Sequence, residues 1–455
     1  MKFYNTLSGL KEDFHPSDTT VKLYVCGITP YAPSHIGHAM FSIVFDVIRR
    51  YLEFKGYEVK HVQNFTDIDD KMIKASSEEG ITTTELSERY IEAYLREIHT
   101  LNVLPAHVYP KATQEIDKII DIIESLIENG FAYNQNGDVY FRISANDEYG
   151  KLSQRNVSDL LAGARVEIDD KKEHPSDFAL WKSRKPNEPS WPSPWGHGRP
   201  GWHIECTAMV THYLGETIDI HGGGQDLIFP HHENEIAQSE AYSNTQPFSR
   251  FWLHNGFLQF GENKMSKSLG NIINVSDLLE KYSPDAIRLF FLNSHYRSPV
   301  VYSEEALTAQ ERASGRLKNA ITLKGESKSQ DILNSQPFVD RFVAAMDDDI
   351  NTPRALAAIF DLVRDINRGH EEALSISHAQ LTLRELTKVL GLKLDDNSKI
   401  DRDINSFIQL LIDLRSGLRE SKQYTLADNL RKRMTELGVI LEDTAQGTKW
   451  KFTRR

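Results

Sequence analysis

Residues 21–62 read as a strand, a glycine turn, a helix and a second strand, and this order constrains the fold more than any other part of the chain. Residues 21–26 are apolar and β-prone, and a glycine and two prolines follow them. Apolar residues then recur at helical spacing from Met40 to Leu52, before a second β-prone run at 57–62. A strand–helix–strand unit requires parallel strands joined by a right-handed crossover. The sequence therefore predicts an α/β fold built on a parallel sheet.

The remaining pattern divides the chain into an α/β half and a helical half. Residues 83–101 and 113–129 show the periodicity of amphipathic helices. Residues 182–202 hold five of the 17 prolines and three of the six tryptophans, a composition that excludes a regular helix or a central strand. From about residue 303 the pattern is helical nearly to the C-terminus.

Composition argues against a membrane-spanning or exported protein. No apolar run reaches the roughly 18–20 residues that a membrane helix needs. The first residues lack the apolar core of a signal peptide, and the 455 residues include only two cysteines. We therefore expect a cytoplasmic protein without a membrane contact. The formal charge is −12, yet residues 401–455 carry 11 Lys/Arg against 8 Asp/Glu, so this tail either contacts a polyanion or presents a solvated helix face.

His35-Ile-Gly-His38 stands where the turn after the first strand leads into the helix. Both histidines would project from the first helical turn, where backbone N–H groups and the helix dipole favour phosphate. Gly37 has no side chain, so a nucleotide could approach the backbone closely. Two surface histidines at a helix start are the alternative interpretation, and these four residues alone do not decide between the two.

Lys264-Met-Ser-Lys267-Ser forms a second polar element. Its two lysines, with Ser266 between them, could hold the negative charge that develops on a triphosphate during transfer. A charged surface loop is the alternative. The position of this element far downstream of the histidine motif favours a nucleotide site.

The two cysteines, Cys26 and Cys206, both lie beside these candidate nucleotide residues. His231 and Glu235 are four residues apart, so a helix would place them on one face. Two thiolates, one imidazole and one carboxylate make a ligand set that favours zinc over magnesium or calcium. A disulfide and two buried free cysteines remain alternatives, and on spacing alone His232 could replace His231.

Together these motifs resemble those of the class I aminoacyl-tRNA synthetases. Over almost its full length the chain resembles, more narrowly, the cysteinyl-tRNA synthetases. Besides the two motifs, the segments that carry the resemblance are 24–29, 66–71, 177–181, 199–206, 219–224, 229–235 and 441–450.

The resemblance implies an activity and a metal. Such an enzyme activates L-cysteine with ATP, accompanied by Mg²⁺, to cysteinyl-AMP, and transfers the cysteine to the 3′ end of tRNA(Cys). The resemblance also implies a zinc ion on Cys26, Cys206, His231 and Glu235 that binds the substrate thiol. An apolar pocket would discriminate an isosteric group by only about 10²-fold. Because serine and alanine offer no comparable ligand, a zinc ion would select cysteine without an editing domain.

The expected site residues divide by role. Those that stabilise charge on the phosphates are His35, His38, Lys264 and Lys267. Those that bind ATP are Gly37, Ser266, Lys267, Gly222 and Asp226, the last two because they follow a predicted strand of a Rossmann-type sheet. Those that contact the amino acid are Thr66 and Trp202, although an aromatic residue such as Trp202 is more often part of a core.

The expected architecture is a Rossmann-type parallel-sheet catalytic domain followed by an all-α C-terminal region. The predicted domains are a catalytic domain 1–245 with an inserted connective segment at about 95–200, a linking domain 246–302 that carries the lysine motif, a helical bundle 303–400, and a tRNA anticodon-binding tail 401–455. We expect a monomer that binds ATP, L-cysteine and tRNA(Cys).

The first motif departs from the family pattern at two positions. Ala32 stands where the family commonly has an acid, and Met40 where it commonly has a base, so two charges that could support the site are missing. The tripeptide Thr-Pro-Tyr at 29–31 also resembles cysteine ligases that act on an amino sugar, as in mycothiol synthesis. Such a ligase is the main alternative, and a non-catalytic zinc-binding RNA protein on the same fold is another.

Overall fold

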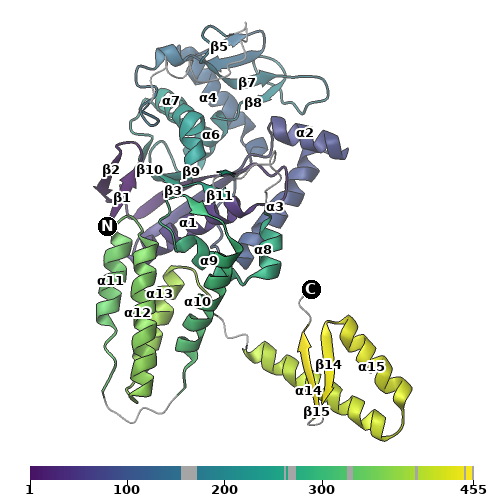
Figure 1. Cartoon of the computed structure of the whole chain (residues 1–455). Coiled ribbons are helices and arrows are strands. Elements are labelled where there is room, and N and C mark those ends of the chain that lie inside the picture. Colours follow the sequence, from purple (N-terminus) through teal and green to yellow (C-terminus); the bar gives the residue numbers. More distant parts are fainter. Residues whose placement is uncertain are drawn as a thin grey trace. The chain divides into compact units, whose positions relative to one another are not determined.

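The computed structural model describes residues 1–154, 172–260, 263–264, 273–324, 331–394, 398–444 and 447–452. The chain divides into two compact units, Met1–Leu394 and Asp395–Arg455 (Figure 1). None of the helices in the described ranges combines the length and apolarity that a bilayer crossing demands. The finer domain boundaries within the first unit stay predictions.

A four-stranded parallel sheet forms the centre of the first unit, as predicted. Its strands are, in spatial order, β10 (Ser249–Asn255), β9 (Ile218–Gly224), β3 (Thr20–Ile28) and β4 (Glu58–Phe65). The predicted strand–helix–strand unit is β3, α1 (Ile36–Phe54) and β4. Because β4 and β9 lie on opposite sides of β3, the strand order reverses between β3 and β9. Ligands of such sheets bind at the carboxyl ends of the strands beside this reversal.

Helix α1 is buried on nearly all sides. Its residues Ile43, Ile48 and Tyr51 have no exposed surface. Strands β4 and β9 contact it on one side, and α9 (Pro284–Leu292) and α13 (Ser377–Val389) contact it on others. Each fully buried large apolar side chain contributes about 1.5–3 kcal/mol. This packing fixes the position of α1, and therefore of its N-terminus beside the sheet.

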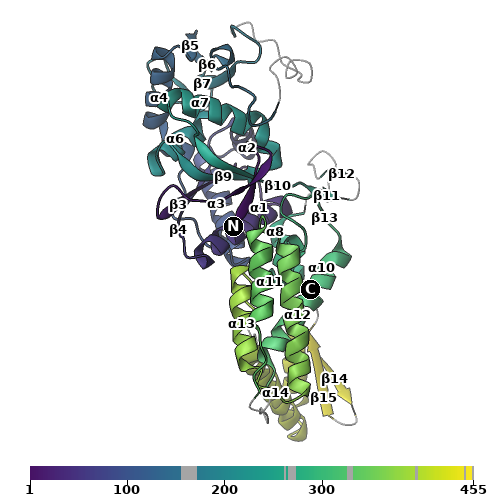
Figure 2. The same cartoon turned by 90° about the vertical axis from the view of Figure 1, so that its left-hand side faces the viewer.

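The segment between β4 and β9 adds helices and a second sheet. The helices are α2 (Asp70–Glu79), α3 (Thr83–Thr100), α4 (Ile116–Glu128) and α6 (Ile204–Tyr213), with short 3₁₀ turns at Ala112–Gln114 and Ile143–Ala145. The antiparallel strands are β5 (Ala132–Gln135), β6 (Asp138–Phe141), β7 (Phe178–Ser183) and β8 (Gly198–Pro200), paired in that order. Figures 1 and 2 show this sheet on the opposite side of the central sheet from helices α11 and α12.

The rest of the first unit surrounds the central sheet. After β9 come a 3₁₀ turn η3 (Gln225–Leu227), a π-helical turn η4 (Ile228–His232) and α7 (Glu233–Ser243). The other strands are the hairpin β1 (Lys2–Asn5) and β2 (Leu10–Asp13), and a small sheet of β11 (Leu258–Phe260), β12 (Asn263–Lys264) and β13 (Val300–Val301). The remaining helices are α8 (Val275–Lys281), α10 (Glu304–Thr322), α11 (Gln336–Asp347) and α12 (Thr352–Glu371).

A buried ion pair joins α1 to α9. The Arg288 guanidinium donates to Asp46 Oδ2 at 2.6 Å, and neither side chain has exposed surface. Arg288 also donates to the carbonyl oxygens of Leu101 and Leu390. A Cβ on Gly391, whose φ is +71°, would lie 2.0 Å from this guanidinium, so a glycine is required there. One arginine thus ties the helix that bears the histidine motif to the helical half of the unit.

The second unit is mainly helical, as predicted, and it ends in a hairpin that the sequence analysis did not predict. Its elements are α14 (Ser398–Glu420), α15 (Tyr424–Glu436), β14 (Val439–Thr444) and β15 (Gly447–Phe452). The two strands pair antiparallel, and their inner side chains pack against α14 and α15. Strand β14 is apolar only at its first three residues and β15 begins with glycine, so neither gives the continuous β-prone run seen at 21–26.

Candidate active site

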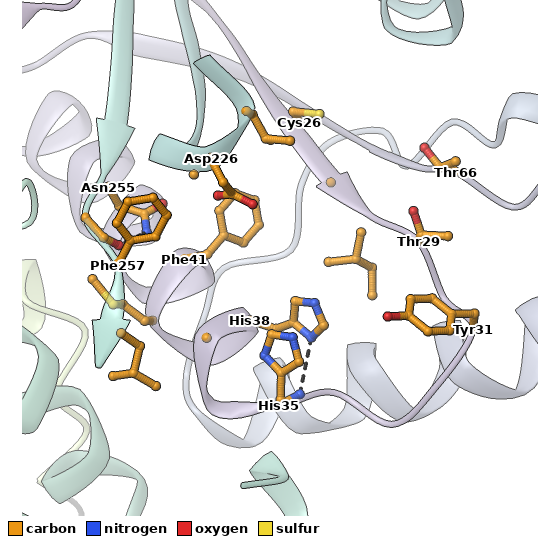
Figure 3. Close-up of a pocket in the computed structure, with 18 of the residues that line it drawn as sticks. Cys26, Thr29, Tyr31, His35, His38, Phe41, Thr66, Asp226, Asn255 and Phe257 are labelled. Atoms are coloured by element: carbon orange, nitrogen blue, oxygen red, sulfur yellow. Dashed lines mark hydrogen bonds between the residues drawn. The ribbon is translucent and has the colours of Figure 1, made fainter. Parts of the chain in front are cut away.

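A cavity of about 350 Å³ lies at the carboxyl ends of β3, β9 and β10, where the sheet topology predicts a ligand. Its walls come from the end of β3 and the turn after it, the first turns of α1, the end of β9, and the segment after β10 (Figure 3). Trp202 and the N-terminus of α2 complete the lining.

The N-terminus of α1 presents the two histidines to this cavity. His35 is the N-cap, and its backbone N–H donates to His38 Nδ1 at 3.2 Å (Figure 3). The two rings stack, with centroids 3.7 Å apart and an interplanar angle of 13°. Because His38 Nδ1 accepts, the proton of the neutral ring lies on Nε2, which can donate to a ligand. The first turn of α1 contains no acidic residue, so its dipole favours an anion in the cavity.

Glycines allow close backbone approach around the cavity. A Cβ on Gly27 would lie 1.7 Å from the Asn64 carbonyl oxygen, so only glycine fits at this point of β3. Gly222, expected at the nucleotide, is not among the cavity-lining residues. A Cβ there would meet the Phe45 ring at 2.2 Å, so this glycine serves the packing of β9 against α1. Gly224, two residues further along β9, lines the cavity instead.

Three of the four expected metal ligands lie together beside the cavity. Cys26 Sγ is 3.8 Å from Cys206 Sγ and 3.4 Å from His231 Nε2. Cys206 Sγ is 3.5 Å from the same ring nitrogen. All three side chains are buried, and both cysteines are free thiols. The two cysteines are therefore not a disulfide, and their positions suit ligands of one ion.

Glu235, the fourth expected ligand, lies at the edge of this group. Its Oε1 is 2.7 Å from His221 Nε2, and its Oε2 is 3.9 Å from His231 Nε2. The side chain has no exposed surface, and among the described residues Oε2 has no hydrogen-bond partner. A buried carboxylate needs a partner or a metal. The unpartnered oxygen is thus available as a ligand, while His221 holds the other.

The two adjacent histidines of η4 point to different partners. His231 Nε2 faces the thiols, and its Nδ1 is 3.1 Å from His203 Nδ1. His232 Nδ1 instead lies 2.8 Å from His254 Nε2. A metal-binding histidine commonly uses its second nitrogen for such an orienting hydrogen bond. The tertiary structure thus brings His231, not His232, to the cysteines.

The buried thiols and the imidazole influence one another's protonation. The hydrogen bond with Cys206 and the neighbouring His231 together lower the pKa of Cys26 to about 6, against the effect of burial. The same hydrogen bond, together with burial, raises the pKa of Cys206 well above its ordinary value. Burial lowers the pKa of His231, but Cys26, Glu235 and Asp226 together raise it, so the net shift is upward.

The residues expected around the substrates are placed as follows. Thr66, Gly37 and Asp226 line the cavity. Trp202 also lines it, is 40% exposed, and lies with its ring centroid 4.4 Å from that of His231. Trp202 therefore covers the group of thiols and imidazole rather than belonging to the core. Lys264 forms part of β12. Ser266 and Lys267 lie outside the described residues.

Sequence reasoning missed several cavity residues. Among those not named in any site role are Thr29, Tyr31, Phe41, Lys71, Asn255 and Phe257. Thr29, Tyr31 and Phe41 follow the predicted strand 21–26, which is a signal because parallel sheets build their sites there. No strand was predicted before Asn255 and Phe257. Met40, where the family pattern has a base, is buried in the cavity wall.

Comparison with known proteins matches this geometry. Residues 14–312 match the family described as tRNA synthetases class I (C) catalytic domain, and residues 341–395 match the DALR domain. A cysteine–tRNA ligase of Dehalococcoides mccartyi is 55% identical over 457 residues and covers 100% of both chains. The chain belongs to the cysteine–tRNA ligase family. A second member of this family, from Carboxydothermus hydrogenoformans, is 47% identical over 464 residues, covering 99% of this chain and 100% of that protein.

Solved structures of related fold extend the comparison. A methionyl-tRNA synthetase of Mycobacterium tuberculosis in complex with methionyl-adenylate has a TM-score of 0.60 at 16% identity, and covers 82% of this chain and 89% of that chain. A leucyl-tRNA synthetase of Agrobacterium radiobacter in a ternary complex has a TM-score of 0.60 at 12% identity, covering 83% of this chain and 84% of that one. At these identities the likeness shows the shared fold. The predicted class I fold is thereby confirmed.

Proposed function

We propose that this chain joins L-cysteine to tRNA(Cys) in two steps within the cavity. The cysteine carboxylate attacks the α-phosphate of ATP, which forms cysteinyl-AMP and releases pyrophosphate. A hydroxyl of the terminal ribose of tRNA then attacks the carbonyl carbon, which forms the ester and releases AMP. The observation that supports this proposal best is the group of Cys26, Cys206 and His231 directly beside a cavity with the class I histidine motif.

The proposed metal site is suited to zinc. Tetrahedral zinc, with bonds of about 2.3 Å to sulfur and about 2.0 Å to nitrogen, needs S···S and S···N separations of about 3.8 and 3.5 Å. Cys26, Cys206 and His231 show separations of 3.8, 3.4 and 3.5 Å. Glu235 Oε2 would complete the set. When bound, the zinc ion supplies a soft cation to which a substrate thiolate can bind and a serine hydroxyl binds poorly.

The side chains of the cavity would position the reactants and stabilise charge. His38 can donate from Nε2, and the N-terminus of α1 favours the phosphates. Lys264 and Lys267 would stabilise the charge that develops on the triphosphate, with Mg²⁺ on ATP. Because the attacking group is a carboxylate, the first step needs no protein base. Catalysis then depends on orientation and charge.

The partner, location and assembly follow as parts of the same proposal. In α15 the consecutive residues Arg431, Lys432 and Arg433 are all exposed. This basic run in the second unit supports a contact with the phosphates of tRNA, near its anticodon. Two free thiols are consistent with a reducing cytoplasm. A monomer remains our prediction for the assembly.

Acceptor specificity is the decisive test. Purified protein is first assayed for cysteine-dependent ATP–pyrophosphate exchange, and then for transfer of labelled cysteine to tRNA(Cys) or to an amino sugar. We expect exchange with cysteine but not with serine, and transfer to tRNA(Cys) alone. Transfer to the amino sugar would favour the mycothiol-type ligase. Bound zinc without any cysteine-dependent exchange would indicate a non-catalytic RNA-binding protein.

A further inference from the structure

Asn255 has an unused hydrogen-bond acceptor in the wall of the cavity. It is the last residue of β10, lines the cavity, and is 6% exposed. Its Nδ2 donates to the Gly256 carbonyl oxygen at 3.0 Å, which assigns the orientation of the amide. Its Oδ1 is buried and finds no hydrogen-bond partner among the described residues. Buried acceptors are nearly always paired, so a ligand in the cavity is expected to supply the donor.

The neighbours of Asn255 suit a flat aromatic ring. In Figure 3, one side of the cavity holds Asn255, Phe257, Phe41 and Asp226. The other side holds Thr29, Tyr31 and Thr66, and the two histidines lie between the two sides. The two phenylalanines come from different elements, α1 and the segment after β10. Aromatic faces and one buried polar atom in the same wall of a cavity suit a nucleobase. The carboxylate of Asp226 is suited to the hydroxyls of an attached ribose.

We propose that Asn255 Oδ1 accepts a hydrogen bond from the exocyclic amine of adenine and thereby selects ATP over GTP. This inference rests on the proposed position of the nucleotide in the cavity. At the corresponding position guanine carries a carbonyl oxygen, which would face Oδ1 acceptor to acceptor. A site that pairs with a polar group of its substrate rejects an analogue without that group far better than apolar contacts do.

The test compares ATP with purine riboside triphosphate, which carries hydrogen in place of the amine. In cysteine-dependent pyrophosphate exchange, we expect the wild-type protein to prefer ATP by about 10-fold or more in kcat/KM. Asn255→Leu keeps similar volume but removes the acceptor, so the same ratio should fall to within about 3-fold of one. Asn293→Leu, an exposed position after α9, serves as the control and should keep the wild-type ratio. If Asn255→Leu does not fold, Asn255→Ala, which also lacks the acceptor, is measured in the same way and should give the same loss of preference.

Three outcomes would separate the possible errors. An unchanged ATP preference in a folded Asn255→Leu protein would overturn the inference. In a second outcome, the Asn255→Leu protein loses its preference for ATP over 3′-deoxy-ATP but keeps its preference for ATP over purine riboside triphosphate. This result would place the Asn255 contact at the ribose and would also overturn the inference. An Asp226→Asn variant with wild-type KM for ATP would instead refute the proposed position of the nucleotide. A raised KM in that variant supports the position whatever the fate of Asn255.

Discussion

Substitution of the buried Arg288 tests how the α/β half and the helical half are joined. Arg288→Met keeps the length of the side chain and removes its charge. Asp46, with a fully buried side chain, would lose its 2.6 Å partner, and the carbonyl oxygens of Leu101 and Leu390 would lose their donor. Breaking a buried pair by removing one partner costs about 3–5 kcal/mol. Asp46 retains the Arg50 guanidinium at 2.8 Å, which favours the lower end of that range.

The expected change in melting temperature follows from the size of the unit. At about 2.1 cal/mol/K per residue, the unit Met1–Leu394 has an unfolding entropy of about 0.8 kcal/mol/K. A loss of about 3–5 kcal/mol therefore lowers Tm by about 4–6 °C, which differential scanning calorimetry resolves easily. The matched control is Lys281→Met, which breaks an exposed pair with Glu304 whose side chains are both 63% exposed. Such a pair contributes about 0–1 kcal/mol, so Tm should change by about 1 °C or less.

The comparison of the two melting temperatures decides whether the buried ion pair stabilises the junction. If Arg288→Met melts within about 1 °C of Lys281→Met, the buried pair does not stabilise the junction and the reasoning is wrong. Arg288→Lys keeps the charge but cannot reach all three acceptors at once, so it should fall between the control and Arg288→Met. This intermediate variant also keeps the test available if Arg288→Met does not fold.

Three further substitutions test the site and its surroundings. Cys206→Ser should lower the zinc content per chain and raise KM for cysteine by about 10-fold or more. The control Met209→Leu, on the same helix, should leave both quantities unchanged. Retained zinc with an unchanged KM in Cys206→Ser would contradict the ligand assignment. Lys267→Ala should lower kcat of pyrophosphate exchange much more than it raises KM for cysteine, and equal effects would argue against a role in the transition state. Burial lowers the pKa of His61 to about 3. Below the ordinary histidine pKa of about 6.5, His61 binds a proton in the unfolded chain but stays neutral in the folded chain. Protonation therefore favours the unfolded state, and the free energy of unfolding falls by about 2 kcal/mol between pH 6.5 and 5. His61→Gln should therefore flatten the dependence of Tm on pH, and an unchanged slope would show that His61 titrates freely in the fold.

The first half of the fold was predictable because its signals are local. The strand–helix–strand unit appears as β3, α1 and β4, with boundaries shifted by a few residues. Period and turn residues report such elements well, since burial of one helix face or one strand is imposed on consecutive residues. The hairpin β14–β15 was missed because its strands contain many polar residues and follow a helix closely.

The site was predictable in its residue types and less so in its arrangement. The two histidines of the first motif lie at the cavity, as their position before a helix indicates. Gly222 does not line the cavity and instead allows close packing against Phe45 on α1. A glycine run of this kind can serve either a ligand or helix packing, and the sequence does not distinguish the two. Asn255 carried no signal at all, since an asparagine after a strand is common and its unpaired oxygen exists only in the folded chain.

The sequence by itself determined the class of fold, the order of the motifs and the residue types of a candidate metal site, because these depend on local pattern and on chemistry that each side chain carries alone. Spacing along the chain left open which of two adjacent histidines meets the thiols; the family resemblance implied His231, and the tertiary structure shows the physical reason. Residues His231 and His232 differ by one position along the chain, but their rings point toward Cys26 and toward His254, respectively. Cys26 and Cys206 meet at 3.8 Å from positions 180 residues apart, because α6 packs against the parallel sheet that contains β3. Such a meeting depends on long-range packing, which no local pattern encodes.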